Sequence, residues 1–208
     1  MDMWDFSLGG GNPYDIEDFS EFDPLSLDWV QFSWKNEKYS VAIGELPGRR
    51  YREVWRNLNR DLGDLQKEGI THVYCMCSNE DLLKYRVPNL IQEYARLGFA
   101  VHHYPIKDDE VPEINELISV LNDIRDFIES GEKVYIHCFA GVGISCVAVI
   151  CLLMHCDESL SPLEAIHSVR MLRGPRAVQT VKQFNFITGF KDFQNAQLSS
   201  QQVRRLSR

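Results

Sequence analysis

Two kinds of apolar segment alternate along the chain, and this alternation constrains the fold more than any other feature of the sequence. Short segments rich in β-branched and aromatic residues predict strands over 29–34, 39–46, 71–77, 99–106 and 132–138. Longer segments with apolar residues at helical spacing predict helices over 52–69, 87–98, 112–131, 144–156, 161–173 and 180–195. This order implies right-handed crossovers and an α/β fold, with a central, mostly parallel sheet flanked by helices. Ligands of such sheets bind outside the carboxyl ends of the strands.

Acidic residues are concentrated at the N-terminus. Residues 1–28 contain 8 Asp and Glu and no Lys or Arg, which accounts for the whole net charge of −8. We therefore expect a disordered acidic arm over 1–28, a single folded domain over 29–195 and a frayed tail over 196–208. Aromatic side chains among the acids could form a docking motif for a basic partner surface, or the arm could be solvated without a specific use. The sequence has no basic stripe, so we expect no binding to nucleic acid.

The sequence also disfavours a membrane span, a secretory signal and a metal site. No apolar segment approaches the roughly 20 residues needed to cross a bilayer, and the acidic N-terminus does not resemble a secretory signal. We therefore expect a cytoplasmic or nuclear protein without a membrane association, in which the six cysteines are reduced thiols. We expect the side chains of Cys75 and Cys77 to point to opposite faces of their strand. On that ground, and because Cys151 and Cys156 lie within an apolar helical run, we expect no structural zinc. We also expect no other metal and no cofactor.

The segment VYIHCFAGVGIS (134–145) places Cys138 between a predicted strand and a predicted helix. Gly141 and Gly143 allow the connecting backbone to turn its N–H groups inward, next to a helix N-terminus, and such a loop binds anions. The same groups would stabilise a thiolate, which makes Cys138 a candidate nucleophile, and Ser145 could donate a hydrogen bond to its sulfur. The alternative is that Cys138 is a small buried apolar residue at the end of a strand.

This segment resembles the signature of the cysteine-dependent protein phosphatases, in which His, Cys, five residues, Arg and Ser or Thr form the phosphate-binding loop. Further segments, in order, resemble the kinase-associated phosphatase family: LPGRRYREV, KYRVPNLI, HHYPIKDD, SPLEAI, LRGPRAVQT and KQFN. The resemblance covers residues 45–193. It implies a dual-specificity phosphatase fold, and a substrate that is the phosphothreonine in the activation segment of a cyclin-dependent kinase.

The resemblance also implies the roles of individual residues. Cys138 would attack phosphorus, and Asp108 would protonate the leaving oxygen and later activate water, with Asp109 as the second candidate for this acid. Without the resemblance, both aspartates could belong to a solvated polar loop. His137 would support the thiolate, although a structural histidine would have the same sequence context. The implied phosphate-binding loop comprises Phe139, Ala140, Gly141, Val142, Gly143 and Ile144.

Ile144 occupies the position at which the family signature has arginine. That arginine binds two phosphoryl oxygens and stabilises the charge of the transition state, so its loss is expected to cost roughly 10² to 10⁵ in rate. Arg176, in a loop that the resemblance places near Gln179, could compensate, or it could be an ordinary exposed arginine. Arg173 is a weaker candidate, because it would cap the carbonyls at the end of its own helix.

Two further questions stay open at the level of the sequence. The resemblance implies a reversible disulfide between Cys77 and Cys138, which would protect the nucleophile from overoxidation, whereas the alternative is a buried core thiol at position 77. Apolar side chains in the last helix could bind the kinase or pack in the core: Phe184, Phe186, Ile187 and Phe190.

Two functions are therefore expected. One is a slow phosphatase acting on a cyclin-dependent kinase, favoured by Cys138, Asp108 and Ser145. The other is a pseudophosphatase that binds the phosphorylated kinase without hydrolysis, favoured by Ile144. The chain could also be a variant, because codons for Arg and Ile can differ by one base. A monomer is favoured.

Overall fold

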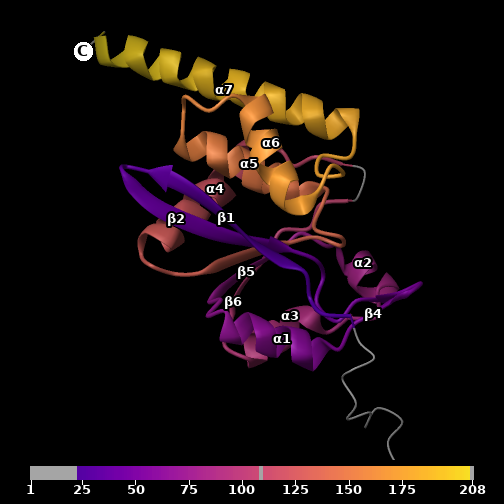
Figure 1. Ribbon diagram of the computed structural model, residues 1–208. Coiled ribbons are helices and arrows are strands. Elements are labelled where there is room, and N and C mark those ends of the chain that lie inside the picture. The colour runs from indigo at the N-terminus through magenta and orange to yellow at the C-terminus, as the bar shows by residue number, and fades with distance from the viewer. Residues whose placement is uncertain (1–22, 108–109, 207–208) are drawn as a thin grey trace, which may run out of the picture.

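The computed structural model describes residues 23–107 and 110–206, and the side chains of these residues as far as 196. A five-stranded sheet forms the centre of the molecule, with the strand order β1-β2-β7-β5-β6 (Figure 1). The strands are β1 (Leu27–Trp34), β2 (Glu37–Gly44), β5 (His72–Cys75), β6 (Ala100–His103) and β7 (Val134–His137). Strands β2, β7, β5 and β6 are parallel, and β1 pairs antiparallel with β2. The predicted mostly parallel α/β sheet is confirmed.

The antiparallel edge follows from a two-residue hairpin. Trp34 pairs with Glu37, and between them Lys35 and Asn36 have φ angles of 49° and 64°. Two consecutive positive φ angles define the tight turn whose twist matches that of the flanking strands. The buried residues of the parallel strands are mainly apolar because helices cover both faces of the sheet.

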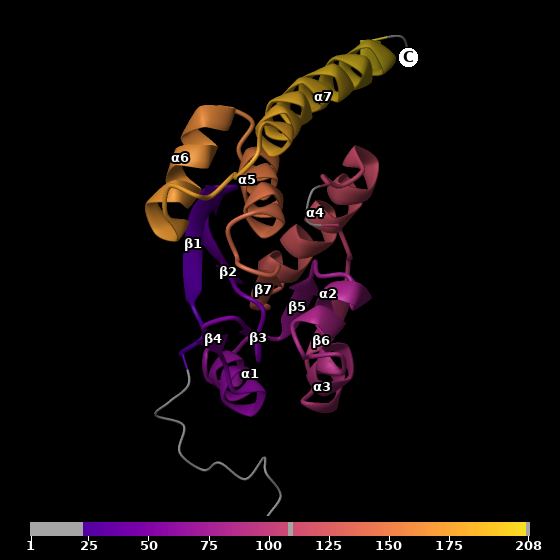
Figure 2. The same ribbon diagram turned by 90° about the vertical axis from the view of Figure 1, so that its right-hand side faces the viewer.

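Helices form one layer on each face of the sheet (Figures 1 and 2). Helices of the N-terminal half pack against the face that carries Ala42, Val73 and Tyr135, and they are α1 (Leu58–Lys67), α2 (Asn79–Lys84) and α3 (Leu90–Arg96). Helices α4 (Ile114–Glu129), α5 (Ile144–Cys156) and α6 (Pro162–Arg173) pack against the other face, and α7 (Val181–Leu206) packs on α5 and α6.

Helix α5 lies at the centre of the second layer, in contact with α4, α6 and α7. All of its residues from Ile144 to Met154 are buried, which explains why its sequence is apolar on every side. Its bounds agree with the prediction of 144–156. Because α5 is fixed on all sides, its first turn provides a rigid base for the loop that precedes it.

Some elements differ from those predicted. The predicted helix over 52–69 begins only at Leu58, because Arg50–Tyr51 (β3) and Val54–Trp55 (β4) form a separate two-stranded sheet before it. Helix α2 was not predicted, although Ser78 and Asp81 form a capping box at its start. Helix α7 continues past the predicted end at 195 and extends away from the sheet (Figure 2).

The N-terminal arm is only partly described. Residues 1–22 lie outside the described part, whereas residues 23–28, which were also assigned to the arm, join the domain. Asp23 accepts a hydrogen bond from the Trp55 backbone N–H at 3.3 Å, and β1 begins at Leu27. Among the described residues, no helix has the length and apolar content required to span a bilayer.

Candidate active site

Cys138 is the first residue after β7, the middle strand of the sheet. The carboxyl ends of β2, β7 and β5 lie level with one another, because His137 is the register partner of both Gly44 and Cys75. A cavity of about 660 Å³ opens at this edge. It is lined by Ser26, Asp28, Glu45, Arg49, Cys138, Phe139, Ala140, Val142, Gly143, Leu172, Arg173, Arg176 and Gln179.

Residues 138–143, which we call the Cys138 loop, turn from β7 into α5. Gly141 has a φ of +66°, and a Cβ atom at this position would lie 2.5 Å from the Gly44 carbonyl oxygen, so only glycine fits. In the described part of the chain, the N–H groups of residues 139–143 have no protein acceptor. The first helical hydrogen bond runs from Val147 N–H to Gly143 C=O at 3.1 Å, which leaves the N–H groups of the first turn unpaired as well. Unpaired N–H groups at a helix N-terminus form an anion-binding site.

Cys138 and Ser145 meet at the base of this loop. The Cys138 Sγ lies 3.1 Å from the Ser145 Oγ, and Ser145 is fully buried. Cys138 is 7% exposed, so its sulfur is accessible only from the cavity. A hydroxyl at this distance can donate to a thiolate and stabilise it as nucleophile and as leaving group. The structure therefore brings together two of the three predicted catalytic residues.

The third predicted residue, Asp108, lies outside the described residues, as does Asp109. The segment that leads to them is described. After β6, Tyr104 N–H donates to the Cys75 carbonyl at 2.9 Å, and Ile106 N–H donates to the Met76 carbonyl at 3.1 Å. The chain thus continues along the carboxyl end of β5 immediately before these aspartates.

Arg173, at the end of α6 and in the lining of the cavity, binds the Cys138 loop. Its Nε donates to the Gly141 carbonyl at 2.9 Å and its Nη2 to the Ala140 carbonyl at 3.4 Å. Its Nη1 forms an ion pair with Asp28 at 2.6 Å, and its side chain is 4% exposed. Arg173 therefore binds carbonyls of the loop, and not those at the end of its own helix as expected. Because its donors are occupied, it positions the loop.

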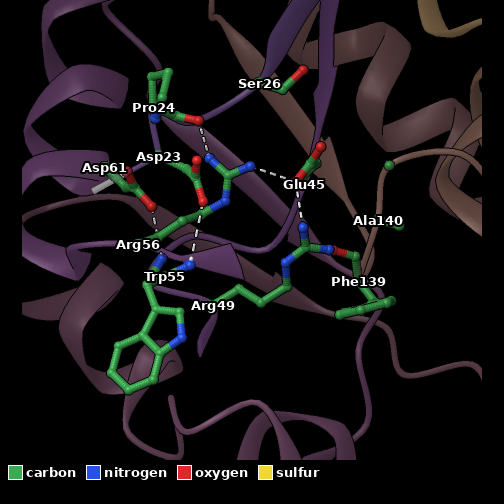
Figure 3. Close-up of polar contacts among 12 residues, drawn as sticks. Asp23, Pro24, Ser26, Glu45, Arg49, Trp55, Arg56, Asp61, Phe139 and Ala140 are labelled. Carbon is green, nitrogen blue, oxygen red and sulfur yellow. Dashed lines mark hydrogen bonds and ion pairs between the residues drawn. The ribbon is translucent and has the colours of Figure 1, made fainter. Parts of the chain in front are cut away.

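Arg49 reaches the same cavity from the segment after β2 (Figure 3). Its Nη2 lies 3.0 Å from Glu45 Oε2, and its Nη1 donates to the Phe139 carbonyl at 3.3 Å. The guanidinium lies 4.6 Å from the centre of the Phe139 ring, and Tyr85 stacks on that ring at 4.0 Å. Burial lowers the pKa of Arg49, and the Glu45 carboxylate opposes this shift. Arg49 is thus a nearly buried cation beside the Cys138 loop.

A second arginine supports this arrangement. Arg56 also binds Glu45, at 2.5 Å, and donates to the Pro24 carbonyl (Figure 3). Asp61, in α1, accepts a hydrogen bond at 2.8 Å from the N–H of Gly48, which lies between β2 and β3. Burial raises the pKa of Asp61 to about 6. These contacts fix the segment from β2 to α1 and hence the position of Arg49.

Ile144 begins α5 with its side chain in the core. It is 4% exposed, packs in the apolar cluster beneath the sheet and does not line the cavity. Gln179 does line the cavity, and a Cβ on Gly143 would lie 3.0 Å from its Oε1. Arg176 is an exposed residue of the cavity lining. Position 144 therefore supplies no polar group to the cavity, whereas Arg49 and Arg176 supply cations.

His137 lies behind the loop and is fully buried. Its Nε2 forms a hydrogen bond with the Tyr94 hydroxyl at 3.0 Å. Cys75 and Cys77 lie beside it, and their sulfur atoms and a His137 ring nitrogen all lie within 4.8 Å of one another. The expectation that Cys75 and Cys77 point to opposite faces is wrong, because side chains alternate at each residue and residues two apart share a face. All six cysteines are free thiols, including Cys77 and Cys138.

The sequence analysis missed the roles of Arg49 and Arg173. The signal for Arg49 was its position in the segment that follows a strand whose parallel neighbour leads into Cys138, which brings both to one edge of the sheet. For Arg173 no local signal existed, because it acts on carbonyl groups 32 residues away in the chain.

Comparisons with known proteins agree with this geometry. The family model described as Cyclin-dependent kinase inhibitor 3 (CDKN3) matches residues 9–166. The cyclin-dependent kinase inhibitor 3 of Homo sapiens is 37% identical over 195 residues, covering 93% of this chain and 91% of that protein. The Rattus norvegicus protein of the same name is 37% identical over 180 residues, covering 86% of this chain and 85% of that protein.

A solved structure supports the same assignment. The crystal structure of kinase associated phosphatase with its catalytic-site cysteine changed to serine has a TM-score of 0.78 and 35% identity. The match covers 82% of this chain and 96% of that chain. The family model, the related sequences and the solved structure point to the same family. The chain therefore belongs to the cyclin-dependent kinase inhibitor 3 family of kinase-associated, cysteine-dependent phosphatases.

Proposed function

We propose that this protein removes the phosphoryl group from the phosphothreonine in the activation segment of a cyclin-dependent kinase. The observation that carries the proposal is the contact of 3.1 Å between Cys138 Sγ and Ser145 Oγ at the base of an open cavity. The N–H groups of the Cys138 loop have no acceptor among the described residues, and N–H groups of this kind suit the oxygens of a phosphoryl group. The kinase as substrate is inferred from the family.

The reaction would proceed in two displacements. The Cys138 thiolate attacks phosphorus and forms a phosphocysteine, while Asp108 gives its proton to the departing threonine oxygen. Asp108 then takes a proton from water, and the resulting hydroxide displaces the sulfur and yields inorganic phosphate. Ser145 donates a hydrogen bond to the returning thiolate, and His137 supports the strand end that carries the nucleophile.

Arg49 takes part in this proposal as the cation of the cavity. An arginine normally grips two phosphoryl oxygens in this chemistry, and Ile144 has no donor. Arg49 is held beside the Cys138 loop by Glu45 and the Phe139 carbonyl, and its remaining N–H groups can bind a phosphoryl oxygen. Arg176 is the second candidate for this role. A relocated cation recovers part of the lost stabilisation, so we expect slow turnover.

The alternative function is a binding protein that shields the phosphothreonine without hydrolysing it. It is favoured by the burial of Ile144, which leaves the cavity without a cation at the position where the family signature has one. In that case the unpaired N–H groups and Arg49 would bind the phosphoryl group, and the Cys138 thiolate would not complete the displacement.

A single assay separates the two functions. The full chain is incubated with a cyclin-dependent kinase that carries the phosphothreonine, and complex formation and phosphate release are both measured. We expect release at a low rate, complete loss of release in Cys138→Ser, and a gain of at least about 100-fold in turnover for Ile144→Arg, because the new guanidinium can bind the equatorial oxygens.

The outcomes have distinct meanings. Complex formation without phosphate release identifies the binding protein. Equal turnover of the starting protein and a correctly folded Ile144→Arg variant contradicts the proposal that position 144 limits the chemistry. Failure of both complex formation and release contradicts the kinase as partner, and a thermal melt of each variant excludes unfolding as the cause.

A further inference from the structure

Cys75, Cys77 and His137 form a compact group of metal-binding side chains behind the Cys138 loop. Cys75 ends β5, His137 ends β7, and the two are direct register partners in adjacent parallel strands. Cys77 follows two residues after Cys75 on the same face. One donor atom from each residue can be chosen so that all three lie within 4.8 Å of one another. The positions of the three residues in the sequence and the pairing of β5 with β7 therefore bring two thiols and one imidazole close together.

The environment of His137 indicates an unfilled bonding position. Its Nε2 is bound by the Tyr94 hydroxyl at 3.0 Å, but its Nδ1 is buried and has no hydrogen-bond partner. A buried ring nitrogen without a partner costs free energy, and such groups are rare in folded proteins. A hydrogen bond to one ring nitrogen, like that of Tyr94, is also what orients metal-binding imidazoles through the other nitrogen.

The two thiols and the imidazole are close enough to bind a single ion, because one donor atom from each lies within 4.8 Å of the others. A metal ion that binds thiols displaces their protons.

We propose that Cys75, Cys77 and His137 bind one thiophilic metal ion, Cu⁺ or Zn²⁺, through two thiolates and one imidazole. Thiolates select these soft and borderline ions over Mg²⁺ or Ca²⁺. Cys75 and His137 are fully buried and Cys77 is 3% exposed, so water cannot readily complete a tetrahedral shell. Structural Zn²⁺ almost always has four ligands, and a dry site with three donors therefore favours Cu⁺.

The site is separate from the phosphatase chemistry. Cys75 and Cys77 pack in the apolar cluster beneath α1 and α3, whereas Cys138 packs in the cluster on the opposite face of the sheet. His137 is nevertheless the residue next to Cys138. An ion held by His137 would connect the ends of β5 and β7 and make the origin of the Cys138 loop more rigid.

The test uses the full-length Cys138→Ser protein, so that the nucleophile cannot bind the probe. Under reducing conditions it is titrated in parallel with Cu⁺ held by bathocuproine disulfonate and with Zn²⁺ held by a chromophoric chelator. We expect one ion per chain. We expect Cys75→Val, which keeps an apolar side chain of similar size in the strand, to weaken binding at least about 100-fold. Cys156→Ser, outside the cluster, is the matched control and keeps the affinity.

X-ray absorption spectra of the loaded protein provide the second measurement, with two sulfur ligands and one nitrogen ligand expected. The proposal is overturned if the protein binds neither Cu⁺ nor Zn²⁺. It is also overturned if Cys75→Val binds the ion as tightly as its parent. If Cys75→Val fails to fold, as judged by circular dichroism, Cys77→Ala replaces it under the same criterion. Uptake of Zn²⁺ alone supports the site and corrects the choice of ion. None of these outcomes depends on phosphatase activity.

Discussion

Arg49 and Arg173 are both nearly buried at the cavity of Cys138, but they have different partners. Arg173 donates to two carbonyls of the Cys138 loop and to Asp28, so its guanidinium is occupied by the protein itself. Arg49 is bound by one carboxylate and one carbonyl through its two Nη atoms, while its Nε is buried and has no partner. Arg49 therefore makes fewer contacts with the protein than Arg173 and keeps N–H groups on its Nη atoms for a ligand, and Arg173 is the arginine that shapes the loop.

Substitution of Arg49 by methionine tests this distinction. We expect Arg49→Met to lower kcat/KM for the phosphorylated kinase by about 10- to 100-fold, because a charged donor to the phosphoryl oxygens is lost. In the Ile144→Arg background the same substitution should cost much less, since the two guanidinium groups would serve the same oxygens. Steady-state kinetics of the four proteins give the coupling between the two positions.

The controls for this cycle come from the same protein. Arg176→Met removes the exposed arginine of the cavity, and we expect it to change kcat/KM less than about threefold. Arg52→Met removes a cation from the neighbouring segment outside the cavity. A larger loss for Arg176→Met than for Arg49→Met would assign the cation to position 176 instead.

At the scale of single residues, the sequence predicted those parts of the site that are close together in the chain. Cys138 and Ser145 are separated by seven positions, and a strand, a glycine turn and a helix suffice to bring them into contact. Arg49 contacts a carbonyl 90 positions away, and its alignment depends on the register between β2 and β7. That register cannot be read from either segment alone.

At the scale of elements, the Cys138 loop depends on the absence of a side chain at one position. Gly141 and Gly98 both have positive φ angles, +66° and +87°. A Cβ at Gly98 would meet no atom within 4 Å, whereas one at Gly141 would collide with the Gly44 backbone. A substitution by alanine therefore strains the backbone at both positions, but only at Gly141 does the new Cβ also collide with neighbouring atoms.

This pair allows a matched experiment. We expect Gly98→Ala to lower the free energy of unfolding by about 1 kcal/mol through backbone strain, without a change in activity. Gly141→Ala should in addition reduce kcat by at least about 10-fold, because the loop must move away from Gly44 and its N–H groups lose their alignment. Urea unfolding and kinetics of both variants check this. Equal kcat in both variants would contradict the steric argument.

Prediction of the elements from sequence succeeded where an apolar segment was long and failed where the element was short. Helix α5 was predicted with its bounds because thirteen residues of uniform apolar character leave few alternatives. Helix α2 has six residues, and its capping box was the only available signal. The hairpin of β3 and β4 was taken for the first turns of a helix, because its strands have two residues each and show no period.

At the scale of the molecule, the ion pair between Asp28 and Arg173 connects the first strand to the sixth helix. Asp28 accepts at 2.6 Å from an arginine whose other donors hold the Cys138 loop. The Arg173 side chain is 4% exposed and that of Asp28 is 34% exposed. Loss of the carboxylate would leave a nearly buried cation without its counter-charge, so this pair affects stability more than pairs on the surface.

Neutralisation of Asp28 tests the connection. We expect Asp28→Asn to lower the free energy of unfolding by about 1 to 3 kcal/mol, and to lower kcat because Arg173 no longer fixes the loop. The exposed pair of Lys67 and Asp64 provides the control, and Asp64→Asn should cost less than about 0.5 kcal/mol. Chemical denaturation measures both, and equal destabilisation would show that Asp28 acts only as a surface charge.

The distance in sequence between Asp28 and Arg173, 145 positions, has a consequence for synthesis of the protein. A ribosome releases the chain from its N-terminus, so the thiol of Cys138 emerges before the arginine that shapes its loop. Contacts between remote segments form late in folding. The Cys138 loop can therefore take the shape seen in the folded protein only after most of the domain has left the exit tunnel.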